Sequence, residues 1–135
     1  MALLNWHPSF SINIEEIDKQ HQLLVNMIND LYDAMNAGKE KAVLEKLINR
    51  LNIYAAMHFA REEHYFDMFG YPETELHKKE HSDFEQKVYK FESDFHKGSQ
   101  SLSTEIVNFL GNWLVGHIKG SDKKYAPFLI ERGIE

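Results

Sequence analysis

Four stretches of this chain repeat an apolar residue every three or four positions, and the period-two alternation of a β-strand is almost absent. The stretches cover residues 17–35, 44–69, 77–95 and 106–117. Each predicts a helix with one apolar face, which must be buried against a partner. Because short connections between long helices favour antiparallel neighbours, the sequence predicts an all-α fold, an up-down-up-down four-helix bundle.

Residues typical of turns separate these stretches. Glycine stands at each expected helix end: Gly38, Gly70, Gly98 and Gly120. Residues 1–16 lack a helical rhythm and predict an N-terminal arm, and residues 121–135 predict a short packed C-terminal tail. With 135 residues, the chain can bury one core but not two. We therefore expect a single domain, 1–135, whose bundle spans 17–120.

Composition excludes several classes of function. The formal net charge of −6 argues against nucleic acid and against an anionic membrane surface as partners. The chain has no cysteine, which rules out disulfides, thiolate metal sites and iron–sulfur clusters. No stretch approaches the roughly 20 apolar residues that span a bilayer, and the N-terminus does not resemble a secretory signal. A soluble, cytoplasmic protein is the expectation.

Metal-type side chains occur on all four helical stretches. Five of the eight histidines and two carboxylates are placed where a helix would point them inward: His21, His58, Glu62, His77, His81, His117 and Asp122. They lie near the start of the first and third stretches and near the end of the second and fourth. In an antiparallel bundle the start of one helix lies beside the end of the next, so all seven should meet at one end of the bundle.

The spacing within each stretch supports this convergence. The pairs in the second and third stretches are four residues apart, so each pair shares a helix face. His117 and Asp122 are five apart, a spacing that a regular α-helix would splay by about 140°. Gly120 and Ser121 lie between them, and we therefore expect the helix to end there and Asp122 to turn back toward the site.

Five imidazoles and two carboxylates are too many ligands for one tetrahedral ion and suit two ions bridged by the carboxylates. A single histidine in a core stripe is more often a hydrogen-bonded packing residue, but Glu is almost never fully buried without a partner. The joint pattern across four stretches favours a dinuclear metal site. His7 lies in the arm, and His64 and His96 fall outside the inward stripes, so we expect all three on the surface.

Four segments carry a family resemblance. They are Ile17–His21, His58–Glu63, His77–His81 and His117–Asp122, with the sequences IDKQH, HFAREE, HKKEH and HIKGSD. These segments resemble the signatures of the hemerythrins, in particular the bacterial ones, in the same order and over essentially the whole chain. The resemblance implies a non-haem di-iron centre that binds O2 reversibly, for transport, storage or delivery.

The resemblance also implies a ligand assignment. One iron takes the later histidines, His77, His81 and His117. The other takes His21 and His58 and keeps an open coordination position. Glu62 and Asp122 bridge the two ions together with an oxo or hydroxo group.

Residues one turn from these ligands, or directly beside them, are candidates for the wall of an O2 pocket: Leu24, Phe59, Trp113, Leu114 and Ile118. Plain core packing is the alternative for each, and for Leu24 and Leu114 the two readings are equally balanced. Asp18 is expected to cap the first helix, although it could instead orient a ligand imidazole. Tyr125 is expected to pack in the tail rather than to hydrogen-bond near the site.

Other functions remain open from sequence. The chain could be an O2 or redox sensor module that signals to a protein partner. It could also be a di-iron peroxidase, nitric-oxide-handling enzyme or ferroxidase. No acid–base pair beyond the expected ligands is visible, so we expect no enzyme activity.

Overall fold

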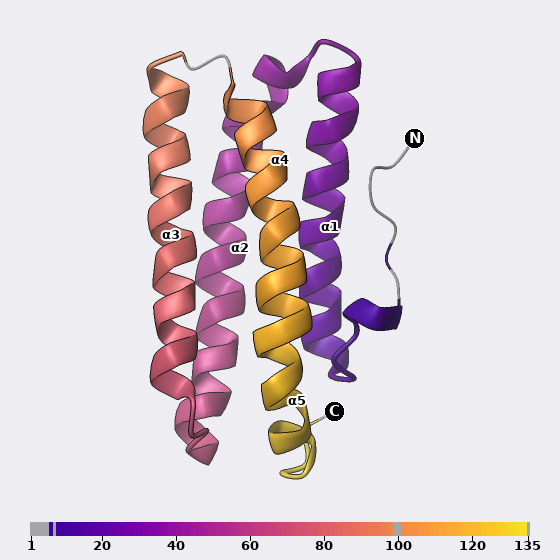
Figure 1. The fold of residues 1–135 in the computed structure, drawn as a ribbon, viewed down its shortest axis with the longest axis vertical. Helices are drawn as coiled ribbons and strands as arrows, with labels where there is room; N and C mark the ends of the chain where they lie inside the picture. The colour runs from indigo at the N-terminus through magenta and orange to yellow at the C-terminus, as the bar shows by residue number, and fades with distance from the viewer. Residues whose placement is uncertain (1–5, 7, 99–100, 135) are drawn as a thin grey trace.

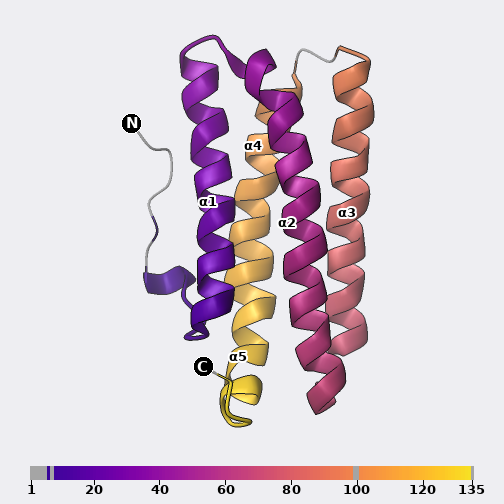
Figure 2. The same ribbon diagram turned by 180° about the vertical axis from the view of Figure 1, so that it is seen from behind.

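A computed structural model of the chain describes residues 6, 8–98 and 101–134, and its long helices stand antiparallel (Figures 1 and 2). The described residues contain α1 (Glu15–Asn36), α2 (Glu40–Phe69), α3 (Thr74–His96) and α4 (Leu102–Trp113), then η2 (Leu114–Asp122) and α5 (Lys123–Ile130). A short 3-10 helix, η1 (Pro8–Phe10), precedes them. No described residue forms a β-strand. The predicted all-α four-helix bundle is confirmed.

Three helices end where the glycines predict, because α1, α2 and α3 stop just before Gly38, Gly70 and Gly98. Gly70 closes α2 with a φ of 67°, a left-handed conformation that glycine adopts without steric penalty, and Gly38 follows α1 with a φ of 69°. These tight ends let α2 reverse direction at once into α3, which sets the first turns of α3 beside the last turns of α2 (Figure 1). Within the described residues, no helix has the length and apolar character needed to cross a membrane.

The buried apolar side chains form two clusters. The larger, which we call the bundle cluster, runs from the middle of the bundle to the end where α1 connects to α2 and includes Leu24, Phe59 and Leu114. The smaller, the end cluster, joins the segment before α1 to the last turns of α2 and to α5: Ile12, Ile14, Ile17, Tyr65, Phe66, Tyr71, Tyr125, Ala126 and Leu129. His21, Glu62 and Asp122 fall between members of these two clusters in sequence, whereas His58 and His117 each lie between two members of the bundle cluster. A polar layer therefore lies where the two apolar clusters approach each other.

The chain ends are more regular than their sequence suggests. The segment after residue 122, expected as a packed tail, folds as α5 across the lower end of the bundle (Figure 1). The segment before α1 contributes Ile12 and Ile14, both fully buried, to the end cluster.

The expectation that Asp18 caps α1 is wrong, because Ile14 is the N-cap residue and Asp18 lies within the first turn. Its carboxylate accepts hydrogen bonds from the Ser11 hydroxyl at 2.5 Å and from the backbone N–H of Ile12 at 2.8 Å. Asp18 thus fastens the preceding segment to α1.

Candidate metal centre

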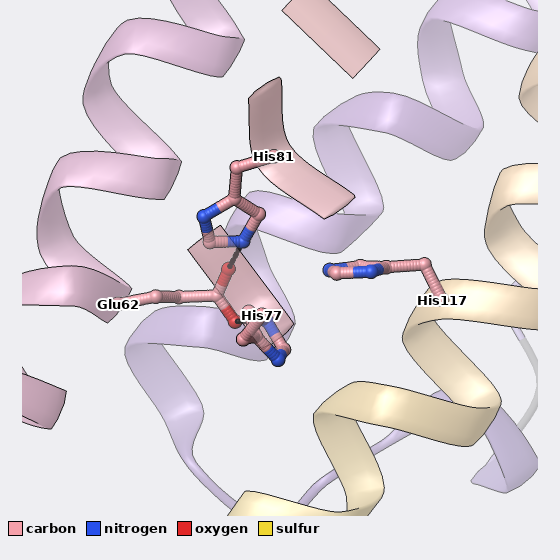
Figure 3. A group of neighbouring side chains, drawn as sticks. All are labelled: Glu62, His77, His81 and His117. Carbon is pink, nitrogen blue, oxygen red and sulfur yellow. Dashed lines mark ion pairs between the residues drawn. The ribbon is translucent and has the colours of Figure 1, made fainter. Parts of the chain in front are cut away.

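The structure brings together all seven metal-type side chains at one end of the bundle, and each is at most 3% exposed: His21, His58, Glu62, His77, His81, His117 and Asp122. Figure 3 shows four of them, with Glu62 from α2, His77 and His81 from α3 and His117 from η2 turned toward a common centre. Two sets of donor atoms are close enough to share an ion. Glu62 belongs to both sets.

Asp122 reaches the centre through a backbone conformation that the sequence did not predict. The helix does not end at Gly120, since α4 continues into η2, a π-helix that includes both His117 and Asp122. Hydrogen bonding from i to i+5 brings residues five apart onto nearly one face, where an α-helix would separate them. The chain therefore stays helical, and Asp122 lies beside His117 without a turn back.

The Glu62 carboxylate lies among three imidazoles. Its Oε1 is 3.1 Å from His58 Nε2 and 3.0 Å from His81 Nε2, and its Oε2 is 3.7 Å from His77 Nε2. Two ligand atoms at right angles on one ion, each bonded at about 2.1 Å, lie about 3.0 Å apart. The observed separations match this value for Oε1.

Asp122 shows the same pattern with its two oxygens directed to different sides. Oδ1 is 2.9 Å from His77 Nε2 and 3.1 Å from His117 Nε2, whereas Oδ2 is 3.0 Å from His21 Nε2. The Nε2 atoms of His21 and His58 are 3.2 Å apart. Each carboxylate therefore stands between imidazoles of two groups, as a bridge between two ions would.

The fit to metal ions also follows from unsatisfied polar atoms. Within the described residues, these buried atoms have no hydrogen-bond partner: Nε2 of His77, His81 and His117, Oε1 of Glu62 and both carboxylate oxygens of Asp122. Leaving a buried donor or acceptor unpaired destabilises a protein by about 1–3 kcal/mol, and by more for a charged group. Six such atoms directed at one small volume are explained if metal ions are their partners.

The electrostatics identify the ionised groups in the absence of ions. Burial alone would raise the pKa of Glu62, but the neighbouring imidazoles outweigh it and hold this pKa well below its usual value. The pKa of Asp122 is lowered by its histidine neighbours in the same way, against burial and the charge of Glu62. Burial lowers the pKa of His58, whereas for His77 the two carboxylates overcome burial and raise the pKa to about 10. Cations entering the site would displace protons from such imidazoles.

Two polar side chains outside the cluster orient ligand imidazoles. Gln20 on α1 accepts a hydrogen bond at 2.5 Å from Nδ1 of His58 on α2. Glu63 on α2 accepts one at 2.9 Å from Nδ1 of His81 on α3. A proton held on Nδ1 leaves Nε2 as the free lone pair, which is the form that binds a metal.

Glu80 on α3 continues the series, since its Oε1 accepts from Nδ1 of His117 at 3.2 Å and from the Ser121 hydroxyl at 2.8 Å. Sequence reasoning missed all three of these acceptors. Each is adjacent in sequence to a ligand on its own helix, yet it contacts a ligand on the next helix. The signal available from sequence was a polar residue beside a ligand in three of the motifs.

Tyr125 is also more than a packing residue, contrary to expectation. It is fully buried in α5, and its hydroxyl donates a short hydrogen bond to Oε2 of Glu62. Burial, with Glu62 and Asp122 nearby, raises the pKa of Tyr125 well above its usual value, so the hydroxyl stays protonated and remains a donor. This bond satisfies the Glu62 oxygen that lies 3.7 Å from His77.

The five expected pocket residues lie next to this centre or in the core above it. Phe59 stacks on His81 with ring centroids 3.9 Å apart, and Trp113 stacks on His117 at the same distance. The aliphatic members, Leu24, Leu114 and Ile118, are buried in the bundle cluster. His64 and His96 are exposed, as expected, and His7 lies outside the described residues.

An antiparallel four-helix bundle with a buried histidine–carboxylate cluster, in which two carboxylates stand between two groups of imidazoles, defines a class of protein: helical-bundle proteins with a dinuclear metal centre. Comparison with known proteins identifies the family within this class. Residues 13–129 match the family described as Hemerythrin HHE cation binding domain.

Individual relatives agree. The chain is 36% identical to a bacteriohemerythrin of Stenotrophomonas maltophilia over 93% of its own length and 81% of the relative's. It is 32% identical to a bacteriohemerythrin of Methylococcus capsulatus, covering 96% and 98% of the two chains. A crystal structure of wild-type hemerythrin superposes with a TM-score of 0.83 at 31% identity, covering 93% and 97%. The chain belongs to the hemerythrin family, and its function is O2 binding at a non-haem di-iron centre.

Proposed function

We propose that this chain is a reversible O2 carrier or store without enzymatic turnover, acting in the cytoplasm, and that the seven clustered side chains are the ligands of its two irons. One observation carries the assignment: buried imidazole and carboxylate atoms without hydrogen-bond partners converge at separations of about 3 Å. The negative net charge argues against nucleic acid and an anionic membrane as partners, and O2 is the proposed ligand, with a protein partner if the chain acts as a sensor or in delivery.

The imidazoles divide unequally between the two ions. His77, His81 and His117 hold one iron, and His21 and His58 hold the other. Glu62 and Asp122 would hold both ions, together with an oxo or hydroxo group. Because only two imidazoles would hold the second ion, O2 would bind on the His21 and His58 side.

With iron bound, the site would supply the electrons that O2 takes up on binding and gives back on release. The protein controls the charge around them. Neutral imidazoles donate less negative charge than additional carboxylates would, which disfavours cleavage of the O–O bond and favours release of intact O2.

Apolar side chains have a separate role, the exclusion of water. The proposed pocket wall consists of five residues: Leu24, Phe59, Trp113, Leu114 and Ile118. Burial of these side chains in or against the bundle cluster keeps water and anions from the open position. The rings of Phe59 and Trp113 additionally fix the planes of His81 and His117 by stacking on them.

Anaerobic reconstitution with Fe(II) tests the proposal. The protein should bind two irons per chain, develop a visible charge-transfer band in air, and lose it under argon over repeated cycles. His117→Ala should abolish the reversible band, while His64→Ala, which removes an exposed histidine of the same bundle, should leave it unchanged. One iron per chain in the parent protein, or a band that never reverses, would contradict the proposal.

A further inference from the structure

A groove opens on the outer surface between α1 and α2, which contact each other and appear on either side of α4 in Figure 2. It has a volume of about 200 Å³, and most of its exposed lining surface is apolar, although Gln20, Arg50 and His58 also line it. Its rim carries three apolar side chains that are each more than half exposed, Leu23, Ile53 and Met57. Single exposed apolar residues are ordinary, but three around one depression form an apolar patch that suits an apolar ligand.

The floor of the groove is the outer wall of the metal centre. His58, assigned above to the iron with the open position, lines the groove, and so does Gln20, which holds its Nδ1. Met27 and Tyr54 line it as well. Both of these are buried members of the bundle cluster that also contains the proposed pocket residues. Two side chains thus separate the groove from the core above the metals.

Neither of these side chains is anchored by a polar contact. The Tyr54 hydroxyl is buried, and within the described residues it has no hydrogen-bond partner. Its ring lies on the His58 imidazole at 5.1 Å with an interplanar angle of 16°. Met27 is an unbranched thioether with several rotatable bonds, the most adaptable kind of core side chain. Ring contacts with His58, Phe59 and Phe84 hold the Tyr54 side chain, so Met27 is the more adaptable part of this wall.

A second opening near the metal centre has a different character. It adjoins His77, has a volume of about 10 Å³ and is lined mainly by polar groups, among them Glu73, Glu80, Ser121 and Lys124. Such a passage suits water and ions and lies beside the iron that is assigned a full set of ligands. O2 is small and apolar, and it partitions into apolar surroundings in preference to polar ones.

We propose that O2 enters and leaves through the groove between α1 and α2, passing between Met27 and Tyr54 to the open position beside His58. The inference rests on the proposed function and adds to it a route and two gating residues. An entry route affects both directions of passage equally, because the bound state itself is unchanged. Narrowing the route must therefore slow association and dissociation by the same factor and leave the affinity constant.

Ile53→Trp tests this directly, since a larger side chain at an exposed rim position narrows the groove without disturbing the core. Association and dissociation of O2, followed by flash photolysis and stopped flow on the iron-loaded protein, should both slow about fivefold at unchanged Kd. Met27→Ala, which removes part of the wall, should accelerate both. Val115→Trp is the matched control, because Val115 is also more than half exposed but lies on η2, and its rates should equal those of the parent.

The inference is overturned if Ile53→Trp and Val115→Trp bind O2 at the same rate, or if Ile53→Trp changes Kd rather than the rates. A second measurement does not depend on O2 binding. Crystals of the iron-loaded protein under xenon pressure should hold xenon in the groove beside Met27 and Met57, since this gas occupies small apolar sites. Xenon bound elsewhere in the bundle with none in the groove refutes the route, whereas a protein that never binds O2 refutes the proposed function instead.

Discussion

Removing one hydroxyl, by Tyr125→Phe, tests whether α5 belongs to the metal centre. The tyrosine is fully buried, and its hydroxyl is the hydrogen-bond donor to Oε2 of the buried, ionised Glu62. Phenylalanine keeps the ring contact with Phe66, whose centroid lies 5.0 Å away, so that no ring-sized cavity forms. The loss is that of a hydrogen bond to a charged acceptor, about 1.5–3 kcal/mol of unfolding free energy in the metal-free protein. A loss of about 2 kcal/mol corresponds to a Tm about 8 °C lower.

Urea unfolding followed by far-UV circular dichroism measures this difference, and the chain supplies a matched control. Tyr54→Phe also removes a buried hydroxyl beside the site, but one without a hydrogen-bond partner among the described residues, so its effect on stability should be near zero or slightly favourable. Equal losses in the two variants, or no loss in Tyr125→Phe, would refute the view that Tyr125 stabilises the Glu62 carboxylate.

Two further predictions concern Glu80, which orients a ligand imidazole, and His77, whose pKa is raised. Glu80→Gln should weaken iron binding about tenfold, measured by competition with a chelator, because it removes the charge that orients His117, whereas Glu85→Gln, an exposed change on the same helix, should have no effect. In the metal-free protein, the pKa of His77 is about 10 when folded and about 6.5 when unfolded, so its stabilisation is complete below pH 6.5 and disappears as the pH rises through 10. Unfolding free energy should fall by an amount on the order of 4 kcal/mol across that interval, and a flat profile from pH 7 to 10 would contradict this.

The convergence of the ligands was predictable because it depends only on helix order and on spacing along each helix. Apolar residues every three or four positions fix which face of a helix is buried, and antiparallel order fixes which ends meet. Pairs such as His77 and His81, four residues apart, then follow directly. No comparable rule applies to His117 and Asp122, since a π-helix differs from an α-helix by its hydrogen-bond register, which apolar periodicity does not encode.

The contacts between helices were not predictable for a related reason. Gln20 and Glu80 lie beside ligands in sequence, but which imidazole they reach depends on the rotation and height of the neighbouring helix. Tyr125 presents a different difficulty, because an aromatic residue in an apolar segment suits a packed tail as well as a hydrogen bond to the site. Only the position of α5 under the bundle decides between the two.

The division of the core into two apolar clusters has a consequence for how the molecule is held together. Dispersion and hydrophobic contacts act only between touching atoms, so the segment before α1 and the helix after Asp122 are held to the first turn of α1 and the last turns of α2 by the end cluster, and the polar layer separates that cluster from the bundle cluster. Iron held by side chains of α1, α2, α3 and η2 would join these helices and thereby also stabilise the end cluster. Iron binding should therefore slow the exchange of the α5 backbone amides with solvent, and this exchange can be measured far from the metal centre itself.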